Sequence, residues 1–188
     1  MFFILQVTFH YWLVEMAVFD TIIRDCRIVS ESKLLKADIG ISAGKIAKIA
    51  RSIRSNDAKT IDASDSLVIP GCIDGHAHIY DRNFAYREDF FSGTQAAAFG
   101  GITTVINMVL TTPVDNPASF KESIRVGKRD AVTDFALHAG MMNLNNLKNI
   151  PALTKMGAAS FKTFTCAPYQ ADDYAILRIM AETKKALK

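Results

Sequence analysis

The sequence has few cysteines, few histidines and no large excess of one charge, and each scarcity narrows the class of protein. Three widely spaced cysteines in 188 residues fit reduced thiols in a cytosol better than a disulfide framework: Cys26, Cys72 and Cys166. The formal net charge is only +3, and Lys and Arg do not cluster with interleaved aromatic residues, so no nucleic-acid partner is expected. The hydrophobic share of 49% is enough for a substantial core in one domain, or in one domain with a small appendage.

The first fifteen residues are apolar and aromatic, with no Lys or Arg before Arg24. They are too few to span a bilayer, which takes about 20 residues. They also lack the basic start and the small-residue cleavage site of a signal peptide. Met16 opens a run typical of a domain start, so residues 1–15 are expected to be an extra segment outside the domain. A membrane-associating segment or a swapped strand is the alternative. Apart from that alternative, no membrane partner is expected.

Residues 16–69 have the pattern of a small β unit. Residues 19–29 are rich in β-branched side chains, and apolar and polar residues alternate on both sides of Ala43 and Gly44, which indicates a hairpin. An apolar segment at 67–69 then leads through Pro70 and Gly71 into the segment that contains the histidines. No helix of useful length is predicted in this region.

Residues 70–188 alternate between strand and helix patterns, which predicts a parallel sheet. The predicted strands are 73–78, 102–109, 135–139 and 160–165, and the predicted helices are 88–99, 117–129, an irregular segment at 144–156, and 172–187. A (β/α)8 barrel needs eight such units and about 250 residues. Four units therefore reach about halfway round a barrel. A four-stranded doubly wound sheet is the alternative.

His76 and His78 are the first candidates for a functional site. Side chains alternate faces along a strand, so Asp74, His76 and His78 are expected on one face. Two neighbouring imidazoles can bind one divalent metal, and imidazole suits zinc, iron, nickel and copper. The alternative is that one or both are ordinary polar residues at a strand end.

Lys162 is the third candidate, in an apolar strand between Phe161 and Thr163. A buried lysine is costly unless it is neutral or paired. It could reach solvent at the strand end or pair with a carboxylate such as Asp74. Alternatively, its amine could lose its proton on burial and take up carbon dioxide, giving an anionic carbamate that could bridge two metal ions.

Three segments in order resemble the cyclic amidohydrolases, the group of dihydropyrimidinase (hydantoinase), allantoinase and dihydroorotase. They are Gly71-Cys-Ile-Asp-Gly-His-Ala-His, residues 88–105, and Gly157-Ala-Ala-Ser-Phe-Lys-Thr-Phe. The resemblance runs from about Val18 to the C-terminus. It implies the β-sandwich portion at residues 16–69 and the first four units of a metal-dependent TIM-type barrel at 70–188.

The resemblance also implies the chemistry. His76 and His78 would bind one of two divalent metal ions, zinc being expected, and Lys162 as a carbamate would bridge both. A metal-bound hydroxide would attack the ring amide carbonyl, because the metal lowers the pKa of its water. The family's other two histidines and its aspartate base come from later strands, and no histidine follows Lys162 here. The aspartate base is therefore expected beyond Lys188, and this chain alone is expected to contain no catalytic base.

Several other polar residues have less specific interpretations. Asp172 and Asp173 are expected to cap the last helix, and His138 to be a hydrogen-bonded strand histidine. Tyr169 is a candidate for the family's substrate-binding tyrosine, although it lies two positions beyond the usual place; a plain loop tyrosine is the alternative. Tyr80 stands where related dihydroorotases carry a carboxylate-binding arginine, and Arg82 is displaced from it, which disfavours dihydroorotate.

The sequence therefore predicts the N-terminal part of a cytoplasmic hydrolase for a cyclic amide or ureide of hydantoin, dihydropyrimidine or allantoin type. Its partners would be this small substrate and the missing half of the barrel, either from the same polypeptide or from a second chain, and a complete enzyme would form a homo-oligomer. A truncated, non-catalytic interaction protein built on the same fold is the alternative, and a metal-free doubly wound binding domain comes third.

Overall fold

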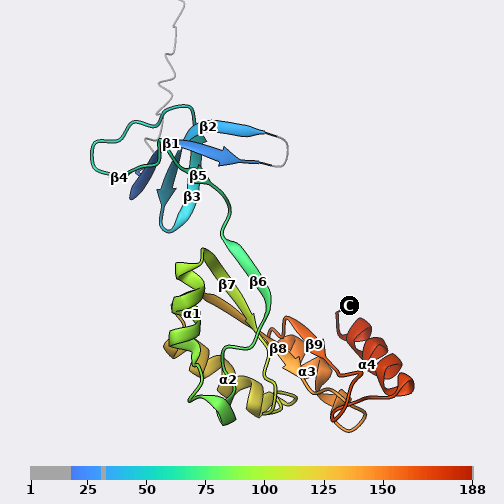
Figure 1. Ribbon diagram of the computed structural model, residues 1–188. Helices are drawn as coiled ribbons and strands as arrows, with labels where there is room; N and C mark the ends of the chain where they lie inside the picture. Colours follow the sequence, from blue (N-terminus) through green and yellow to red (C-terminus); the bar gives the residue numbers. More distant parts are fainter. Residues whose placement is uncertain (1–17, 31–32, 188) are drawn as a thin grey trace, which may run out of the picture. The chain divides into compact units, whose positions relative to one another are not determined.

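The computed structural model describes residues 18–30 and 33–187, which form two compact units (Figure 1). The first unit ends at Pro70 and the second begins at Gly71. The expectation for residues 1–15 lies outside the described residues. Within the described part of the chain, no helix combines the length and the apolar character that a bilayer crossing requires.

The first unit is one mixed five-stranded sheet. Its strands are β1 (Thr21–Val29), β2 (Leu34–Ser42), β3 (Lys45–Ala50), β4 (Lys59–Asp62) and β5 (Leu67–Val68). The order is β3-β2-β1-β4, with β5 also paired to β1. The predicted hairpin joins β2 to β3, where Ala43 and Gly44 both have positive φ (49° and 73°). Two positive φ values are the mark of the type I′ turn, whose twist suits a two-residue hairpin.

The second unit is a parallel sheet with four α-helices. Its elements are β6 (Cys72–Ala77), η1 (Arg82–Phe84), α1 (Phe90–Phe99), β7 (Ile102–Asn107), α2 (Pro117–Asp130), β8 (Asp134–Gly140), η2 (Leu147–Asn149), α3 (Ile150–Lys155), β9 (Ser160–Lys162) and α4 (Asp173–Ala186). Asp89 and Asn116 begin α1 and α2 as capping boxes, and Asp172 caps α4. These caps accept hydrogen bonds from backbone N–H groups that the helix cannot satisfy itself.

The strands of the second sheet follow one another in chain order, β6-β7-β8-β9, and all pairs are parallel (Figure 1). Crossovers between parallel strands are right-handed, so without a reversal of order the helices gather on one face. The main core lies on that face and includes Phe90, Val105, Leu137 and Ile150. A doubly wound sheet reverses its strand order. The sheet therefore differs from the doubly wound alternative and curves in the manner of a barrel segment.

Two predicted strands of the second unit are shorter in the structure, and the apolar segment before Pro70 pairs within the first unit. The apolar residues before Pro70 form β5, which pairs with β1 in the first unit, whereas the histidine segment forms β6, which pairs with β7 in the second. Pro70 separates them because proline cannot donate to a strand ladder. The predicted strand 102–109 ends at Asn107 in β7, and the predicted strand 160–165 ends at Lys162 in β9.

Candidate metal centre

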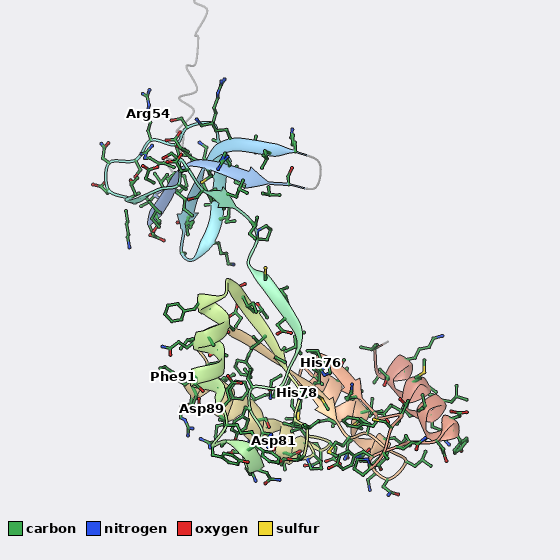
Figure 2. All side chains as sticks on the ribbon, viewed as in Figure 1. Arg54, His76, His78, Asp81, Asp89 and Phe91 are labelled. Atoms are coloured by element: carbon green, nitrogen blue, oxygen red, sulfur yellow. The ribbon has the colours of Figure 1, made fainter. Side chains whose placement is uncertain are left out.

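The histidines and Lys162 belong to the same end of the parallel sheet. His76 lies in β6, His78 directly follows that strand, and Lys162 is the last residue of β9. Figure 2 shows both histidines where β6 runs into the loop that carries Asp81. In parallel α/β sheets the carboxyl ends of the strands form the usual ligand site. The fold thus brings residues of the first and the last strand of this sheet, far apart in the sequence, to one end of the sheet.

The rings of His76 and His78 lie close together, edge to face. Their ring centroids are 5.0 Å apart with an interplanar angle of 74°. Loss of water around the ring lowers the pKa of His76 below its ordinary value, and the positive charge of Lys162 lowers it further, while Asp74 acts in the opposite direction. A lowered pKa keeps the imidazole neutral, which is the form that binds metals.

One hydrogen bond determines which nitrogen of His78 is available. The Nδ1 atom lies 2.7 Å from the carbonyl oxygen of Met108. A carbonyl oxygen only accepts, so Nδ1 must carry the proton and Nε2 keeps its lone pair. Metal-binding histidines commonly donate their second N–H to a carbonyl or carboxylate in this way. His78 is therefore presented in a form suited to coordination through Nε2.

His138 lies beside His76, with ring centroids 5.4 Å apart. Both of its nitrogens are engaged: Nδ1 bonds the Ser160 hydroxyl, and Nε2 lies 3.0 Å from the carbonyl oxygen of Gly75. The Gly75 carbonyl only accepts, so Nε2 carries the proton. This arrangement agrees with the interpretation of His138 as a hydrogen-bonded strand histidine.

Lys162 is half-buried and held mainly through its backbone. Its carbonyl accepts from the Met142 N–H at 2.9 Å, and its Nζ lies 5.4 Å from the centroid of the Phe164 ring. The Asp74 carboxylate accepts a hydrogen bond from the backbone N–H of His76 instead of pairing with Lys162. Among residues 18–30 and 33–187 no ion pair joins Lys162 to a carboxylate. The amine thus has no carboxylate partner within the described part of the chain.

The donor set fits part of a metal centre. In the described residues, no group of three or more His, Cys, Asp or Glu side chains is placed to hold a metal ion. Two adjacent imidazoles, one with its tautomer determined by Met108, provide neutral nitrogen donors of the kind that zinc accepts. A carbamate on Lys162 would add anionic oxygen donors from the same end of the sheet.

The aspartate base expected beyond Lys188 lies outside the described residues, which end at Leu187. Lys188 itself is also outside them. The position of the base and of the family's other two histidines therefore stays a prediction.

Two further residues singled out from the sequence, Asp172 and Tyr169, lie in the segment between β9 and α4. The Asp172 carboxylate accepts from the Ala175 N–H at 2.7 Å, which confirms its interpretation as a helix cap. Tyr169 is 45% exposed and packs on Phe164, with ring centroids 5.6 Å apart. The role of Tyr169 in substrate binding stays a prediction.

Two polar residues that support the site were missed in the sequence. Asn107 is 1% exposed; its Oδ1 accepts from the N–H groups of Ile79 and Tyr80, and its Nδ2 donates to the Tyr80 carbonyl. Asp81 accepts hydrogen bonds from the segment that follows β7. The available signals were an asparagine that ends a β-branched strand and an aspartate three residues after His78.

The chain is similar in sequence and fold to several known proteins. The dihydroorotase of Methanothermobacter thermautotrophicus is 40% identical over 148 residues, which cover 78% of this chain and 33% of that protein. The allantoinase of Bacillus licheniformis is 34% identical over 185 residues, covering 90% and 40%. The solved structure of an L-hydantoinase (dihydropyrimidinase) from Arthrobacter aurescens matches with a TM-score of 0.79 and 31% identity, covering 90% and 39%. No family model matches the chain.

These relatives confirm the resemblance: the chain is a homologue of the cyclic amidohydrolases. It spans between 33% and 40% of the length of these curated relatives. That share agrees with the prediction of an N-terminal portion.

Proposed function

We propose that the chain is the N-terminal part of a metal-dependent hydrolase that opens a cyclic amide or ureide ring of hydantoin, dihydropyrimidine or allantoin type. One observation carries the proposal: His76 and His78 lie 5.0 Å apart at the end of the sheet that also carries Lys162, and Nε2 of His78 is left free by its bond to Met108. The widely spaced cysteines of the sequence favour action in the cytoplasm.

His76 and His78 would hold one divalent ion, and Lys162 as a carbamate would bridge it to a second ion, zinc being the expected metal. Such ions polarise a carbonyl and lower the pKa of bound water. The protein's own part is to keep the imidazoles neutral and oriented and to hold the lysine near them. The remaining ligands and the aspartate base would come from strands beyond Lys188.

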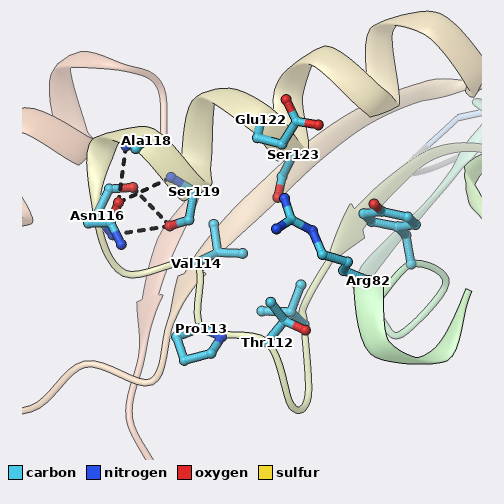
Figure 3. A pocket seen from close by; sticks show the side chains of 11 residues that line it. Arg82, Thr112, Pro113, Val114, Asn116, Ala118, Ser119, Glu122 and Ser123 are labelled. Atoms are coloured by element: carbon cyan, nitrogen blue, oxygen red, sulfur yellow. Dashed lines mark hydrogen bonds between the residues drawn. The ribbon is translucent and has the colours of Figure 1, made fainter.

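Tyr80 and Arg82, at and near the position of the dihydroorotase arginine, favour a substrate without a carboxylate, while Arg87 is the positive residue that lines a small pocket with His78. The Tyr80 ring stacks on Phe90 at a centroid distance of 5.1 Å and packs against the core. Arg82 lines a cavity of about 370 Å³ beside α2, with Thr112, Ser119 and Glu122 (Figure 3). Neither residue therefore places a positive charge beside His78. The dihydroorotase relative at 40% identity keeps dihydroorotate among the rings to be assayed.

The structure also supports a missing barrel half as a partner. Within the described residues β9 pairs only with β8, and an apolar groove of about 580 Å³ runs between β9 and α4. The side chains that line this groove include Ala158, Phe161, Ile176, Ile179, Met180 and Leu187. We infer that further barrel strands, from the same polypeptide or a second chain, pair with β9 and cover the groove. The sheet at 18–70 would then be part of the family's β-sandwich, and the complete enzyme would be a homo-oligomer.

A non-catalytic interaction protein is the second candidate. It is favoured by the small number of ligands in the described residues, where no set of three His, Cys, Asp or Glu is assembled. In that case the histidines would keep their places through hydrogen bonds, such as that of His78 to Met108, without holding a metal.

Equilibrium dialysis of the chain against zinc and bicarbonate tests the proposal. We expect zinc to bind, and 13C-labelled bicarbonate to give a carbamate signal in NMR that disappears in Lys162→Met. His76→Gln and His78→Gln should abolish zinc binding, whereas the matched control His138→Gln should retain it. Co-production with a homologous C-terminal half should then give ring opening of hydantoin, dihydrouracil or allantoin, with dihydroorotate assayed beside them.

The two candidates differ in this assay. If the chain binds no zinc with bicarbonate present, even together with the C-terminal half, the hydrolase proposal is wrong and the interaction protein remains. If zinc binds equally to the wild type and to His76→Gln and His78→Gln, these two histidines are not the zinc ligands.

A further inference from the structure

The ends of β6 and β7 stay joined for several residues after the strands themselves end. We call this the β6–β7 junction and define it as residues 77–81 together with 107–112. The Met108 N–H donates to the Ala77 carbonyl at 2.8 Å, and the Asn107 side chain bonds the backbone of Ile79 and Tyr80. Segments that leave a sheet have backbone groups in need of partners, and side chains supply them here.

Asp81 forms the far end of this junction. Its Oδ2 accepts from the N–H groups of Leu110 (3.0 Å) and Thr111 (2.6 Å) and from the Thr111 hydroxyl (2.9 Å). Its Oδ1 accepts from the Thr112 hydroxyl at 2.6 Å and from the Asn83 N–H at 3.1 Å. Partial burial raises the pKa of Asp81, but the bonds from Thr112, Thr111 and Asn83 outweigh it and hold the pKa well below the usual range. The carboxylate is therefore ionised and fully engaged.

The bonds of Ala77 and Asp81 hold the backbone on both sides of the Met108 carbonyl, which accepts from the His78 ring. The Met108 carbonyl lies between two anchored amides: Met108 N, bonded to Ala77, and Leu110 N, bonded to Asp81. A peptide group held on both sides cannot turn freely. If the second anchor is removed, the peptide after Met108 can rotate and its carbonyl can leave Nδ1 of His78.

We propose that Asp81 is a positioning residue for His78: by anchoring Leu110 and Thr111 it aims the Met108 carbonyl at Nδ1 and so presents Nε2 to a metal. The proposal deepens the proposed function and rests on it for its metal. The effect on the tautomer of His78, however, requires no metal. Asp81 itself would touch neither metal nor substrate.

The tautomer of His78 is the first measurement. The 15N-labelled chain is studied by proton–nitrogen correlation NMR of the imidazoles at about pH 8.5, where an ordinary histidine is neutral. The signal of His78 is assigned by its loss in His78→Gln. We expect the Nδ1–H tautomer almost alone in the wild type, and a growing share of the Nε2–H tautomer in Asp81→Ala.

Asp89→Ala is the matched control. Asp89 is an aspartate of the same loop that caps α1 by accepting from the N–H and hydroxyl of Ser92, both at 2.8 Å (Figure 2). Its loss should lower stability through the lost cap without changing the His78 tautomer. If Asp81→Ala does not fold, Asp81→Asn preserves the side-chain volume and should show the same shift to a smaller extent.

Zinc dialysis is the second measurement, because loss of a residue that orients a metal ligand typically weakens binding about 10- to 100-fold. We expect a weakening in this range for Asp81→Ala and none for Asp89→Ala. An unchanged His78 tautomer in both Asp81 variants, or a wild type without the Nδ1–H form, would overturn the inference. A wild type that has the Nδ1–H tautomer but binds no zinc would contradict the proposed function and leave the role of Asp81 in orienting His78 intact.

Discussion

The β6–β7 junction and the end of β9 contribute to the same candidate metal centre but are held very differently. At the junction, Asn107 and Asp81 bond the backbone of both segments, and Met108 binds the ring of His78. At the end of β9, two hydrogen bonds connect the strand to Met142. The Met142 N–H donates to the Lys162 carbonyl, and the Met142 carbonyl accepts from the Thr163 hydroxyl. The ring of His78 is thus oriented in advance, while no carboxylate of the described residues pairs with the amine of Lys162.

This difference suits the chemistry proposed for each side. A histidine ligand works best when its tautomer and orientation are set before the metal binds. A lysine that takes up carbon dioxide must first lose its proton, and its side chain must accommodate a larger anionic group. We therefore expect substitutions at the junction to affect stability and histidine geometry, and substitutions near Lys162 to affect mainly charge.

The largest expected effect is that of Asn107→Leu. The leucine would leave three backbone groups without partners: the buried N–H of Ile79 and the partly buried N–H and carbonyl of Tyr80. Each buried unpaired group costs about 1–3 kcal/mol, so we expect the free energy of unfolding to fall by about 3 kcal/mol or more. Urea unfolding followed by circular dichroism measures this.

Thr163→Val is the matched variant at the end of β9. It removes the single hydroxyl bond to the Met142 carbonyl, and we expect a loss of about 1 kcal/mol or less. If Thr163→Val lowers stability as much as Asn107→Leu, the contrast between the two regions is wrong.

The next largest loss of stability is expected for Gly140→Ala, at a position between the two regions. A Cβ atom there would lie 2.5 Å from the Met108 Cε but 4.0 Å from the Lys162 Cβ. The methionine must move, and because its side chain is flexible we expect a loss of about 1 kcal/mol, at the low end for overpacking. Gly75→Ala is the control, since its Cβ would meet nothing within 4 Å. Equal urea midpoints for the two variants would contradict this prediction, because they would show that the Met108 side chain moves aside without a loss of stability.

The smallest effect concerns charge. The positive charge of Lys162 disfavours the imidazolium form of His76, so Lys162→Met should raise the pKa of His76 toward its ordinary value. Lys155→Met, at the end of α3, should leave it unchanged. NMR titration of the His76 ring measures both. A His76 pKa that does not rise in Lys162→Met would mean that the amine lies too far from His76 to share a metal with it.

Much of the fold could be predicted from local patterns. The β2–β3 hairpin follows from Ala43 and Gly44, and the start of α4 follows from Asp172. The structure adds Asp89 and Asn116 as the caps of α1 and α2. The apolar residues on the two sides of Pro70 have the same local pattern, and only the structure shows which sheet each of them joins: β5 pairs with β1 and β6 pairs with β7. Strand pairing is a long-range property, and no local pattern specifies it.

The candidate site divides in the same way. The spacing of His76 and His78 and the apolar surroundings of Lys162 could be recognised because both are local features of strands. The contact of His138 with Ser160, and the bonds of Asn107 and Asp81 across the junction, join residues 22 to 31 positions apart. Such contacts exist only once β6, β7, β8 and β9 lie side by side.

The sequence by itself determined the alternation of strands and helices, the cap of the last helix and the pair of histidines at the end of one strand, because periodicity and capping depend on neighbours within a few residues. Only the tertiary structure decided that the strands follow in chain order with helices on one face, that Lys162 acts on the charge of His76, and that Met108 selects the tautomer of His78. These features depend on groups from different strands meeting at one end of the sheet, where distance and direction govern the chemistry.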